Sequence, residues 1–256
     1  MNMTFIQTII LGIVEGVTEF LPVSSTFHLI WTSRLMNIVQ SDFVKLFQVF
    51  IQSGAILAVV FLYWREILKN TPLMKRLIVS FIPTAVVGYV LYDRIKGVFF
   101  ESIQYTTIVF IIVGVNFLIV ELLIKWNKIH TQKEINALTY RDAVLIGLFQ
   151  ALAVVPGVSR AGAVLVGMMI LGYRRDESAK YSFMLSIPTI FAASAFDFIE
   201  MKEMIVQDNT FVLTLTIGTA VAFMSAYFGV TWFIKYLQNH SLILFGWYRI
   251  LIGIIL

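Results

Sequence analysis

The sequence has no cysteine and few charged residues. The lack of cysteine excludes disulfides and thiolate metal sites, and it leaves the redox compartment open. Only 13% of the 256 residues are charged, about half the share of a typical soluble domain. No polar stretch is long enough for a soluble domain, and the longest loop, 126–140, is too short for its own core. A cleavable signal peptide is not expected, because Glu15 and Glu19 interrupt the first apolar run and no basic segment precedes it.

Apolar residues are abundant and fall in long runs. They make up 59% of the chain, and the mean hydropathy is +0.87. This composition predicts an all-α polytopic membrane protein. Six segments are expected to span the bilayer, namely 43–64, 77–92, 103–124, 178–199, 211–234 and 241–256. Two of them, 77–92 and 241–256, have about 16 residues where roughly 20 are usual, so they should extend further or be buried by neighbours.

Two other apolar segments, 4–36 and 142–173, are each interrupted by a proline-containing break. The breaks read "LPVSS" and "VPGVSR", and each contains a serine suited to cap the helix that follows. Each half is too short to cross a bilayer comfortably. We therefore expect two re-entrant helical hairpins whose tips are buried in protein or line a wet cavity.

The two hairpins resemble one another in sequence. "GIVEGVTEFLPVSST" aligns without a gap with "GLFQALAVVPGVSRA", which pairs Gly12 with Gly147 and Ser24 with Ser159. Three spans follow each hairpin, and three is odd, so the second hairpin should enter from the opposite face of the membrane. The sequence thus predicts a single membrane domain with an inverted-topology repeat, about 1–125 and 142–256, joined by a linker of about 126–141.

The basic residues support this parity. Alternating the spans places twelve Lys and Arg residues on one side and five on the other. The positive-inside rule makes the richer side cytoplasmic. The linker is then cytoplasmic, both termini lie outside the cell membrane, and the first hairpin opens outward. Because the net charge of +4 is spread through short loops, no nucleic-acid partner is expected. The sequence leaves homodimerisation undecided.

Polar residues cluster in the first hairpin. Glu15 and Glu19 are spaced i, i+4, so a helix places both on one face, where they need a proton, a basic partner or a divalent cation. Ser24 is expected to cap the second half-helix, which leaves Ser25 free. His28 lies one turn after Ser25 and could act as its general base or as a proton donor to a leaving group. The alternative is a structural polar network with one glutamate protonated.

The second hairpin supplies Arg160 directly after its break. A guanidinium at this depth needs an anion, and together with backbone N–H groups at a helix N-terminus it suits a phosphate. The alternative is an internal ion pair with Glu15 or Glu19, and the two interpretations are compatible. Gln48 and Gln52 have two equally good interpretations, support of the site and hydrogen bonding between helices. Arg249 is expected to have a packing or supporting role.

"EGVTEFLPVSSTFH" together with "PGVSRAG" resembles the undecaprenyl pyrophosphate phosphatases, the membrane enzymes associated with bacitracin resistance. Segments such as "IQSGAILAVV", "YSFMLSIP" and "YRILIG" extend the resemblance over the whole chain. It implies hydrolysis of undecaprenyl pyrophosphate to the monophosphate and inorganic phosphate, which recycles the lipid carrier of cell-wall synthesis. It also implies an outward-facing site in the cytoplasmic membrane, supported by Mg²⁺ or Ca²⁺.

The resemblance also assigns roles to residues. Glu15 and Glu19 match the acidic pair, and we expect them to hold the cation. Ser25 matches the candidate nucleophile and His28 the essential histidine. The residues expected to bind substrate are Ser24, Thr26, Gly157, Ser159 and Arg160. We expect Ser25 to be activated by His28 or by a glutamate. Direct attack by water, with Ser25 only binding, stays an alternative.

The chain departs from the family pattern at several positions. Phe27 replaces a glycine, Ala161 and Val164 replace hydroxyl residues, and Gln48 replaces a common glutamate. Each lost hydrogen bond is expected to weaken phosphate binding by about 0.5–1.5 kcal/mol. Because the groups assigned to chemistry remain, we expect an active enzyme that is slower or has an altered preference. The rival interpretations are a polyprenyl-phosphate flippase or anion transporter, since inverted repeats and broken helices are typical of transporters, and an inactive scaffold.

Overall fold

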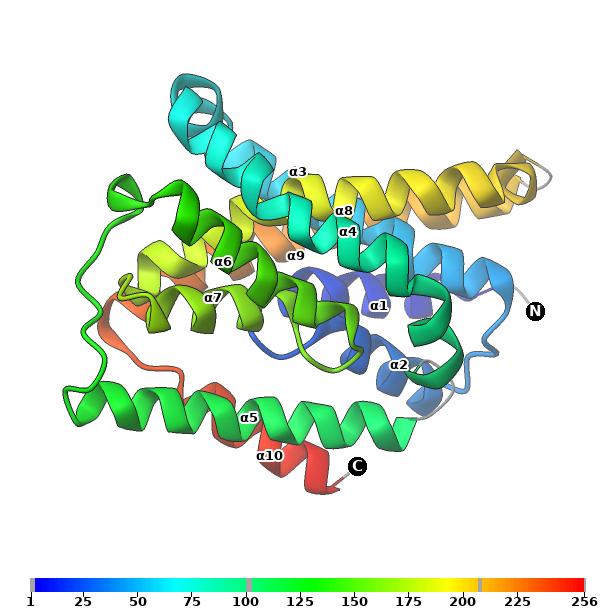
Figure 1. Ribbon diagram of the computed structural model, residues 1–256. Coiled ribbons are helices and arrows are strands. Elements are labelled where there is room, and N and C mark those ends of the chain that lie inside the picture. The colour runs from blue at the N-terminus through cyan, green and yellow to red at the C-terminus, as the bar shows by residue number, and fades with distance from the viewer. Residues whose placement is uncertain (1–2, 100–102, 207–208, 256) are drawn as a thin grey trace.

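The computed structural model describes residues 3–99, 103–206 and 209–255, and these are almost entirely helical. Figure 1 shows the helices running roughly along one direction, with the α1–α2 and α6–α7 breaks meeting near the centre. The helices are α1 (Phe5–Thr18), α2 (Ser25–Leu35), α3 (Asp42–Lys69), α4 (Thr71–Phe99), α5 (Ile103–Lys125), α6 (Tyr140–Ala151), α7 (Arg160–Ile170), α8 (Arg175–Val206), α9 (Asn209–Asn239) and α10 (Ile243–Ile255), with short 3-10 turns η1 (Ile135–Ala137) and η2 (Leu152–Val154).

Each of the six expected spans corresponds to one helix. The segment expected at 77–92 is part of the longer helix α4, which begins at Thr71, whereas α10 has only 13 residues and stays short. Among the described residues, four helices are long and apolar enough to cross a membrane, namely α3, α4, α5 and α9. The all-helical class is therefore confirmed.

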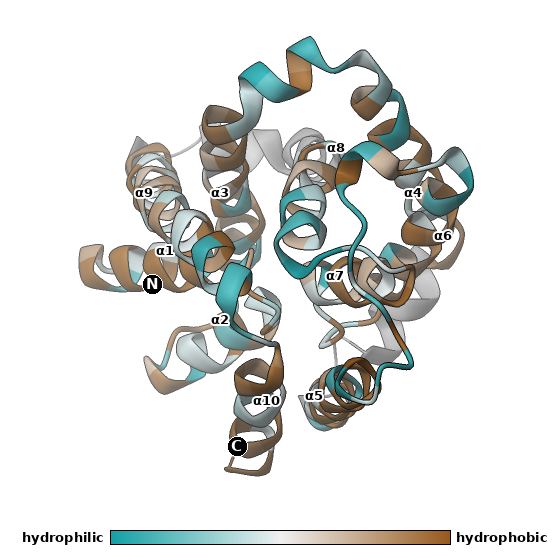
Figure 2. Ribbon diagram, turned by 90° about the vertical axis from the view of Figure 1, so that its left-hand side faces the viewer, coloured by the Kyte–Doolittle hydropathy of each residue, from teal (hydrophilic) through white to brown (hydrophobic). Residues whose placement is uncertain are grey.

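The helices expose large apolar side chains over much of the surface. Phe61, Phe191 and Ile254 are each more than half exposed. In Figure 2, hydrophobic residues dominate the helices, and hydrophilic residues gather in the segments that connect them at the near end. An apolar exterior of this extent is unstable in water and suits lipid, so the chain is an integral membrane protein.

Each of the two interrupted segments forms a pair of short helices, α1–α2 and α6–α7, and both pairs begin with the same cap. Thr4 caps α1 in a capping box with Gln7, and Thr139 caps α6 in a capping box with Asp142. The two boxes are equivalent in the alignment that pairs Ser24 with Ser159. The half-helices have 11 to 14 residues, shorter than the roughly 20 that a hydrocarbon core of about 30 Å requires.

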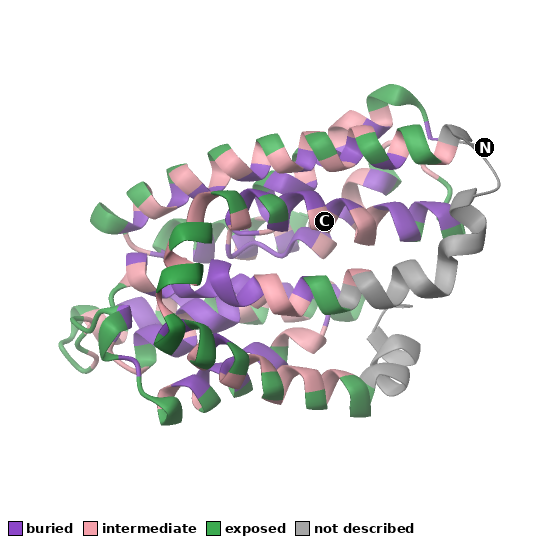
Figure 3. Cartoon of the chain, turned by 90° about the horizontal axis from the view of Figure 1, so that it is seen from above, coloured by how far each residue is buried: buried purple, intermediate pink, exposed green. Residues whose placement is uncertain are grey.

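The first helix of each hairpin packs against a helix from the other half of the chain. Helix α1 packs against α9, and α6 packs against α4, while α5 and α10 lie side by side along one edge (Figure 1). The approach of α6 to α4 is close, since a Cβ on Gly147 would lie 2.3 Å from the Ser80 carbonyl oxygen. Figure 3 shows buried residues on the helix faces turned toward one another and exposed residues on the outer faces. The two breaks are thereby enclosed between helices.

Candidate active site

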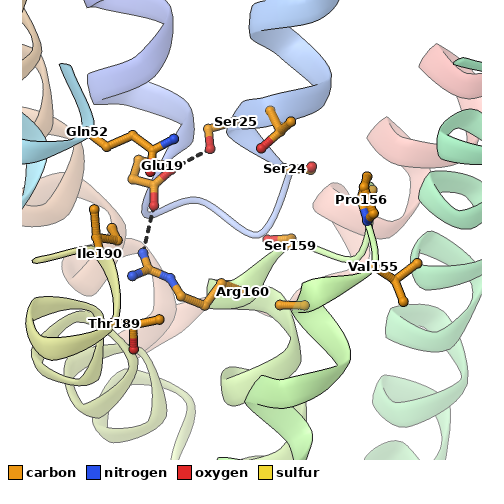
Figure 4. A pocket seen from close by; sticks show the side chains of 13 residues that line it. Glu19, Ser24, Ser25, Gln52, Val155, Pro156, Ser159, Arg160, Thr189 and Ile190 are labelled. Carbon is orange, nitrogen blue, oxygen red and sulfur yellow. Dashed lines mark hydrogen bonds and ion pairs between the residues drawn. The ribbon is translucent and has the colours of Figure 1, made fainter. Parts of the chain in front are cut away.

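The breaks of the two hairpins meet through an ion pair. Arg160, the first residue of α7, donates from Nη2 to Oε1 of Glu19, the C-terminal cap residue of α1, over 2.8 Å. Both side chains are largely buried, with exposed fractions of 12% and 8%. Figure 4 shows the two groups facing one another across the space between the hairpins. This confirms that an acid of the first hairpin faces the guanidinium of the second.

The second carboxylate oxygen of Glu19 is also engaged. The Ser25 hydroxyl donates to Oε2 of Glu19, as the upper dashed line in Figure 4 marks. Ser25 is the first residue of α2, so Glu19 and Ser25 lie at the two ends of the same break. The sequence analysis expected Ser25 to be free. Its hydroxyl is instead bonded to a carboxylate that can accept its proton.

A pocket of about 200 Å³ lies between the breaks. Several water molecules fit in this volume, since each occupies about 30 Å³ in the liquid. The residues that line it are Glu19, Ser24, Ser25, Thr26, Gln52, Ala153, Val155, Pro156, Gly157, Ser159, Arg160, Thr189 and Ile190. All five residues predicted to bind substrate are among them. Thr189 and Ile190 of α8 were not predicted, because no local motif marks them and only the packing of α8 brings them to the wall.

Glu15 lies behind this wall and does not line the pocket. Its side chain is completely buried beside Glu19, and neither of its carboxylate oxygens has a hydrogen-bond donor among the described residues. Nε and Nη1 of Arg160 are likewise buried without an acceptor in that part of the chain. A buried carboxyl group without a donor requires a proton or a cation. Unsatisfied groups of opposite sign thus flank the Glu19–Arg160 pair.

These residues can be tested for their fit to a divalent cation. No cluster of three or more acidic or histidine side chains exists among the described residues, so the protein alone does not provide a full coordination shell. Mg²⁺ is commonly bound by one or two carboxylates together with substrate phosphates and water. Glu19 borders the pocket and suits a cation shared with a phosphorylated substrate, whereas Glu15 lies behind the wall and would add a second carboxylate from that side.

His28 makes its hydrogen bonds away from Ser25. Its Nδ1 donates to the Ser24 carbonyl oxygen over 2.8 Å, because a carbonyl can only accept. Nε2 of the neutral ring is then an acceptor, and it lies 2.7 Å from the Tyr248 hydroxyl of α10. His28 does not line the pocket. In this structure Glu19, and not His28, is the group bonded to Ser25, and the general-base role of His28 stays a prediction.

The two breaks share an unusual backbone conformation. Ser24 has φ 65° and ψ 94°, and the equivalent Ser159 has φ 70° and ψ 111°. Positive φ at a residue with a side chain is strained and persists only where the surroundings enforce it. Ser159 accepts a hydrogen bond from the Gly162 N–H, whereas Ser24 makes no such bond, so the prediction that the Ser24 side chain caps α2 is wrong. Its hydroxyl is left to line the pocket.

Gly157 has a structural reason for being glycine. Its φ is +94°, and a Cβ there would lie 2.6 Å from the Thr106 carbonyl oxygen of α5. The second break can approach α5 this closely only without a side chain at this position.

The departures from the family pattern lie outside the pocket wall. Phe27 is buried and stacks on Phe110 of α5 with ring centroids 4.0 Å apart. Ala161 and Val164 are buried in the packing of α7, and neither lines the pocket. Gln48 donates to the Ser33 hydroxyl over 3.0 Å and joins α3 to α2. The structure therefore gives no reason to expect that Ala161 and Val164 remove phosphate contacts from the wall.

The fold and the site define an integral membrane protein of helical hairpins, with a charged, partly open pocket suited to an anionic group. The chain belongs to the family described as bacitracin resistance protein BacA, whose pattern matches residues 8–255. An undecaprenyl-diphosphatase of Sulfurihydrogenibium sp. is 46% identical over 99% of this chain and 98% of that protein. Those of Persephonella marina and Aquifex aeolicus are 44% and 41% identical over 99% of this chain, covering 98% and 97% of their own lengths.

Proposed function

We propose that the protein hydrolyses undecaprenyl pyrophosphate to undecaprenyl phosphate and inorganic phosphate. The observation that carries this proposal is the sequence of contacts Ser25–Glu19–Arg160 across the two breaks, in which a nucleophile, a base and a phosphate-binding cation border one pocket. Undecaprenyl-diphosphatases that match nearly the whole chain support the same activity. The product is the lipid carrier that cell-wall synthesis reuses, which agrees with the association of the family with bacitracin resistance.

The proposed chemistry uses these three side chains in two steps. Ser25 Oγ attacks the terminal phosphorus while its proton passes to Glu19, and the bond from that phosphorus to the bridging oxygen breaks, releasing undecaprenyl phosphate. Water then attacks the phosphoserine, inorganic phosphate leaves, and the proton returns to Ser25. Arg160 and the N-terminus of α7 stabilise the negative charge on the transferring group. A Mg²⁺ or Ca²⁺ ion held by Glu15 and Glu19, when bound, would supply further charge neutralisation.

A direct attack by water is the alternative for the first step. In that case Glu19 activates the water and Ser25 only orients the substrate. Rapid quenching of the reaction with substrate labelled at the terminal phosphate distinguishes the two routes. Label on Ser25 supports covalent catalysis, and its absence at every time point supports the direct route.

The proposed topology places this pocket toward the outside of the cytoplasmic membrane. We propose six transmembrane helices, α3 to α5 and α8 to α10, and two re-entrant hairpins that enter from opposite faces, α1–α2 and α6–α7. The equivalent capping boxes, the matching backbone at Ser24 and Ser159 and the exchanged packing partners support an inverted repeat of about 1–125 and 142–256. Both termini outside, a cytoplasmic linker at about 126–141, homodimerisation and the lack of a nucleic-acid partner stay predictions.

The test is release of phosphate from a polyprenyl pyrophosphate by the purified protein in detergent. We expect phosphate release that a chelator abolishes and added Mg²⁺ or Ca²⁺ restores. Phosphate release that survives complete chelation would contradict the cation proposal and leave the hydrolase proposal standing. No release with any cation, together with lipid translocation in vesicles, would instead support transport, which the named relatives do not favour.

Replacing Tyr248 by Phe should lower kcat by about tenfold with little change in KM. The Tyr248 hydroxyl holds Nε2 of His28, and His28 in turn holds the Ser24 carbonyl oxygen of the strained break. Losing the hydroxyl therefore loosens the break without removing a group from the pocket. Tyr236→Phe is a suitable control, since that hydroxyl donates to the Ser241 carbonyl oxygen, which belongs to neither break. Equal kcat values for the two variants would show that the Tyr248–His28 contact has no catalytic role.

A further inference from the structure

Arg249 of α10 is a buried guanidinium with no acidic partner. Its side chain is completely buried, and none of the ion pairs among the described residues includes it. Nε donates to the Phe110 carbonyl oxygen of α5 over 3.0 Å. The guanidinium also lies 4.2 Å from the centroid of the Phe110 ring. A charge kept out of water in this way needs other acceptors, and the chain provides them from the two breaks.

The remaining bonds of Arg249 reach both breaks at once. Nη1 donates to the Pro22 carbonyl oxygen over 3.0 Å, and Nη2 donates to the Gly157 carbonyl oxygen. In the alignment that pairs Ser24 with Ser159, Pro22 pairs with Gly157. The two terminal nitrogens of one guanidinium therefore hold equivalent carbonyls of the two hairpins.

Each of these carbonyls lies two residues before a strained serine. Pro22 precedes Ser24, and Gly157 precedes Ser159, and both serines have positive φ. Ser25 and Arg160 follow directly, so the position of each carbonyl governs where the nucleophile and the phosphate-binding guanidinium lie. Helices α5 and α10 run along one edge of the molecule (Figure 1). Arg249 does not line the pocket, so any effect it has on the pocket is exerted from outside.

We propose that Arg249 is the positioning residue that fixes the two breaks relative to one another, and thereby sets the separation of Ser25 and Arg160. The guanidinium suits this role because it is planar and carries its donors in a rigid fork, so two acceptors bound to its two ends have a fixed spacing. An ammonium group has no such fork and cannot hold both carbonyls in the same relation. The effect of Arg249 on the reaction rests on the hydrolase function proposed above, whereas its effect on the breaks does not.

The test compares Arg249→Lys and Arg249→Met with the matched control Arg175→Lys. Arg175 is also an arginine in an ion pair, with a side chain 22% exposed, and its hydrogen bonds go to Glu121 and not to either break. Amide hydrogen exchange of peptides covering residues 21–26 and 155–160 reports the breaks without any need for activity. We expect exchange at both breaks to be about tenfold faster in the Arg249 variants and unchanged in the control.

Steady-state kinetics with a polyprenyl pyrophosphate then separates positioning from general stability. We expect kcat to fall about 100-fold in Arg249→Met and by less in Arg249→Lys, with KM changed by less than about threefold. The control should keep the parent kcat. Faster exchange at only one break would overturn the proposal. So would Arg249→Lys and Arg249→Met proteins whose exchange and kcat equal those of the Arg175→Lys control. A parent protein without hydrolase activity would contradict the proposed function, and the exchange measurement would still decide the role of Arg249.

Discussion

Replacing Glu19 by Gln should lower kcat for phosphate release by about 10³-fold, because the substitution removes the base beside Ser25. Glu19 accepts the Ser25 hydroxyl on one oxygen and the Arg160 guanidinium on the other. Glutamine has nearly the same shape but carries no charge and accepts a proton poorly. It also leaves the buried Arg160 without its counter-ion, so the local charge balance changes together with the base.

Two variants serve as comparisons. Ser25→Ala keeps the Glu19–Arg160 pair and removes only the nucleophile, so it should abolish covalent turnover while the thermal unfolding midpoint stays near that of the parent. Glu66→Gln removes an ion pair with Lys180 away from the pocket, and it should keep the parent kcat. The measurement is initial-rate kinetics on variants whose folding is verified by thermal unfolding in detergent. If Glu19→Gln keeps more than about a tenth of the parent kcat, Glu19 is not the base.

Replacing Glu121 by Ala should lower the free energy of unfolding by about 3–5 kcal/mol without changing the chemistry of the site. Glu121 of α5 is almost completely buried and pairs with Arg175 at the start of α8. It also accepts the Leu242 N–H just before α10, over 2.8 Å. Its removal leaves a guanidinium and an N–H unpaired where three helices converge, so the unfolding midpoint in detergent should fall by several degrees.

The double variant Glu121→Leu with Arg175→Met provides the control. Removing both charges avoids the unpaired guanidinium, so the double variant should be more stable than the single variant Glu121→Ala. A Glu121→Ala protein with the unfolding midpoint of the parent would show that this pair contributes nothing measurable. Equal losses in the single and double variants would assign the effect to the Leu242 N–H, which both variants leave without its acceptor, and not to the unpaired guanidinium.

The sequence predicted the helical class and the hairpins because these depend on local pattern. Apolar runs mark the helices, and a proline next to a serine marks each break whatever the rest of the fold does. Arg160 was expected to meet Glu15 or Glu19 because an unpaired charge at this depth is costly, and its 2.8 Å contact with Glu19 confirms this. The prediction that the Ser24 side chain caps α2 was wrong, since that side chain makes no capping hydrogen bond.

Other parts of the site have no local signal. Thr189, Tyr248 and Arg249 reach the breaks or the pocket only because α8 and α10 pack beside the hairpins. Arg249 was expected to have a packing or supporting role, and its bonds to both breaks could not be read from the sequence. The group that bonds to Ser25 also could not be read from the sequence, because His28 and Glu19 are both close to Ser25 along the chain and only the folded backbone places Glu19 within hydrogen-bond distance.

The amino-acid sequence by itself determined that this chain is a helical membrane protein with two broken hairpins, and which charged groups must be neutralised within it. These properties follow from transfer free energies and helix periodicity, which act over a few neighbouring residues. The tertiary structure alone decided that a carboxylate oxygen of Glu19 faces Ser25, that Glu15 is buried behind the pocket, and that the Arg249 guanidinium bonds to both breaks. They depend on how distant segments pack, as in the contacts of Arg160 with Glu19, 141 positions apart, and of Arg249 with Pro22, 227 positions apart. Side-chain direction at such contacts is fixed only when the helices pack.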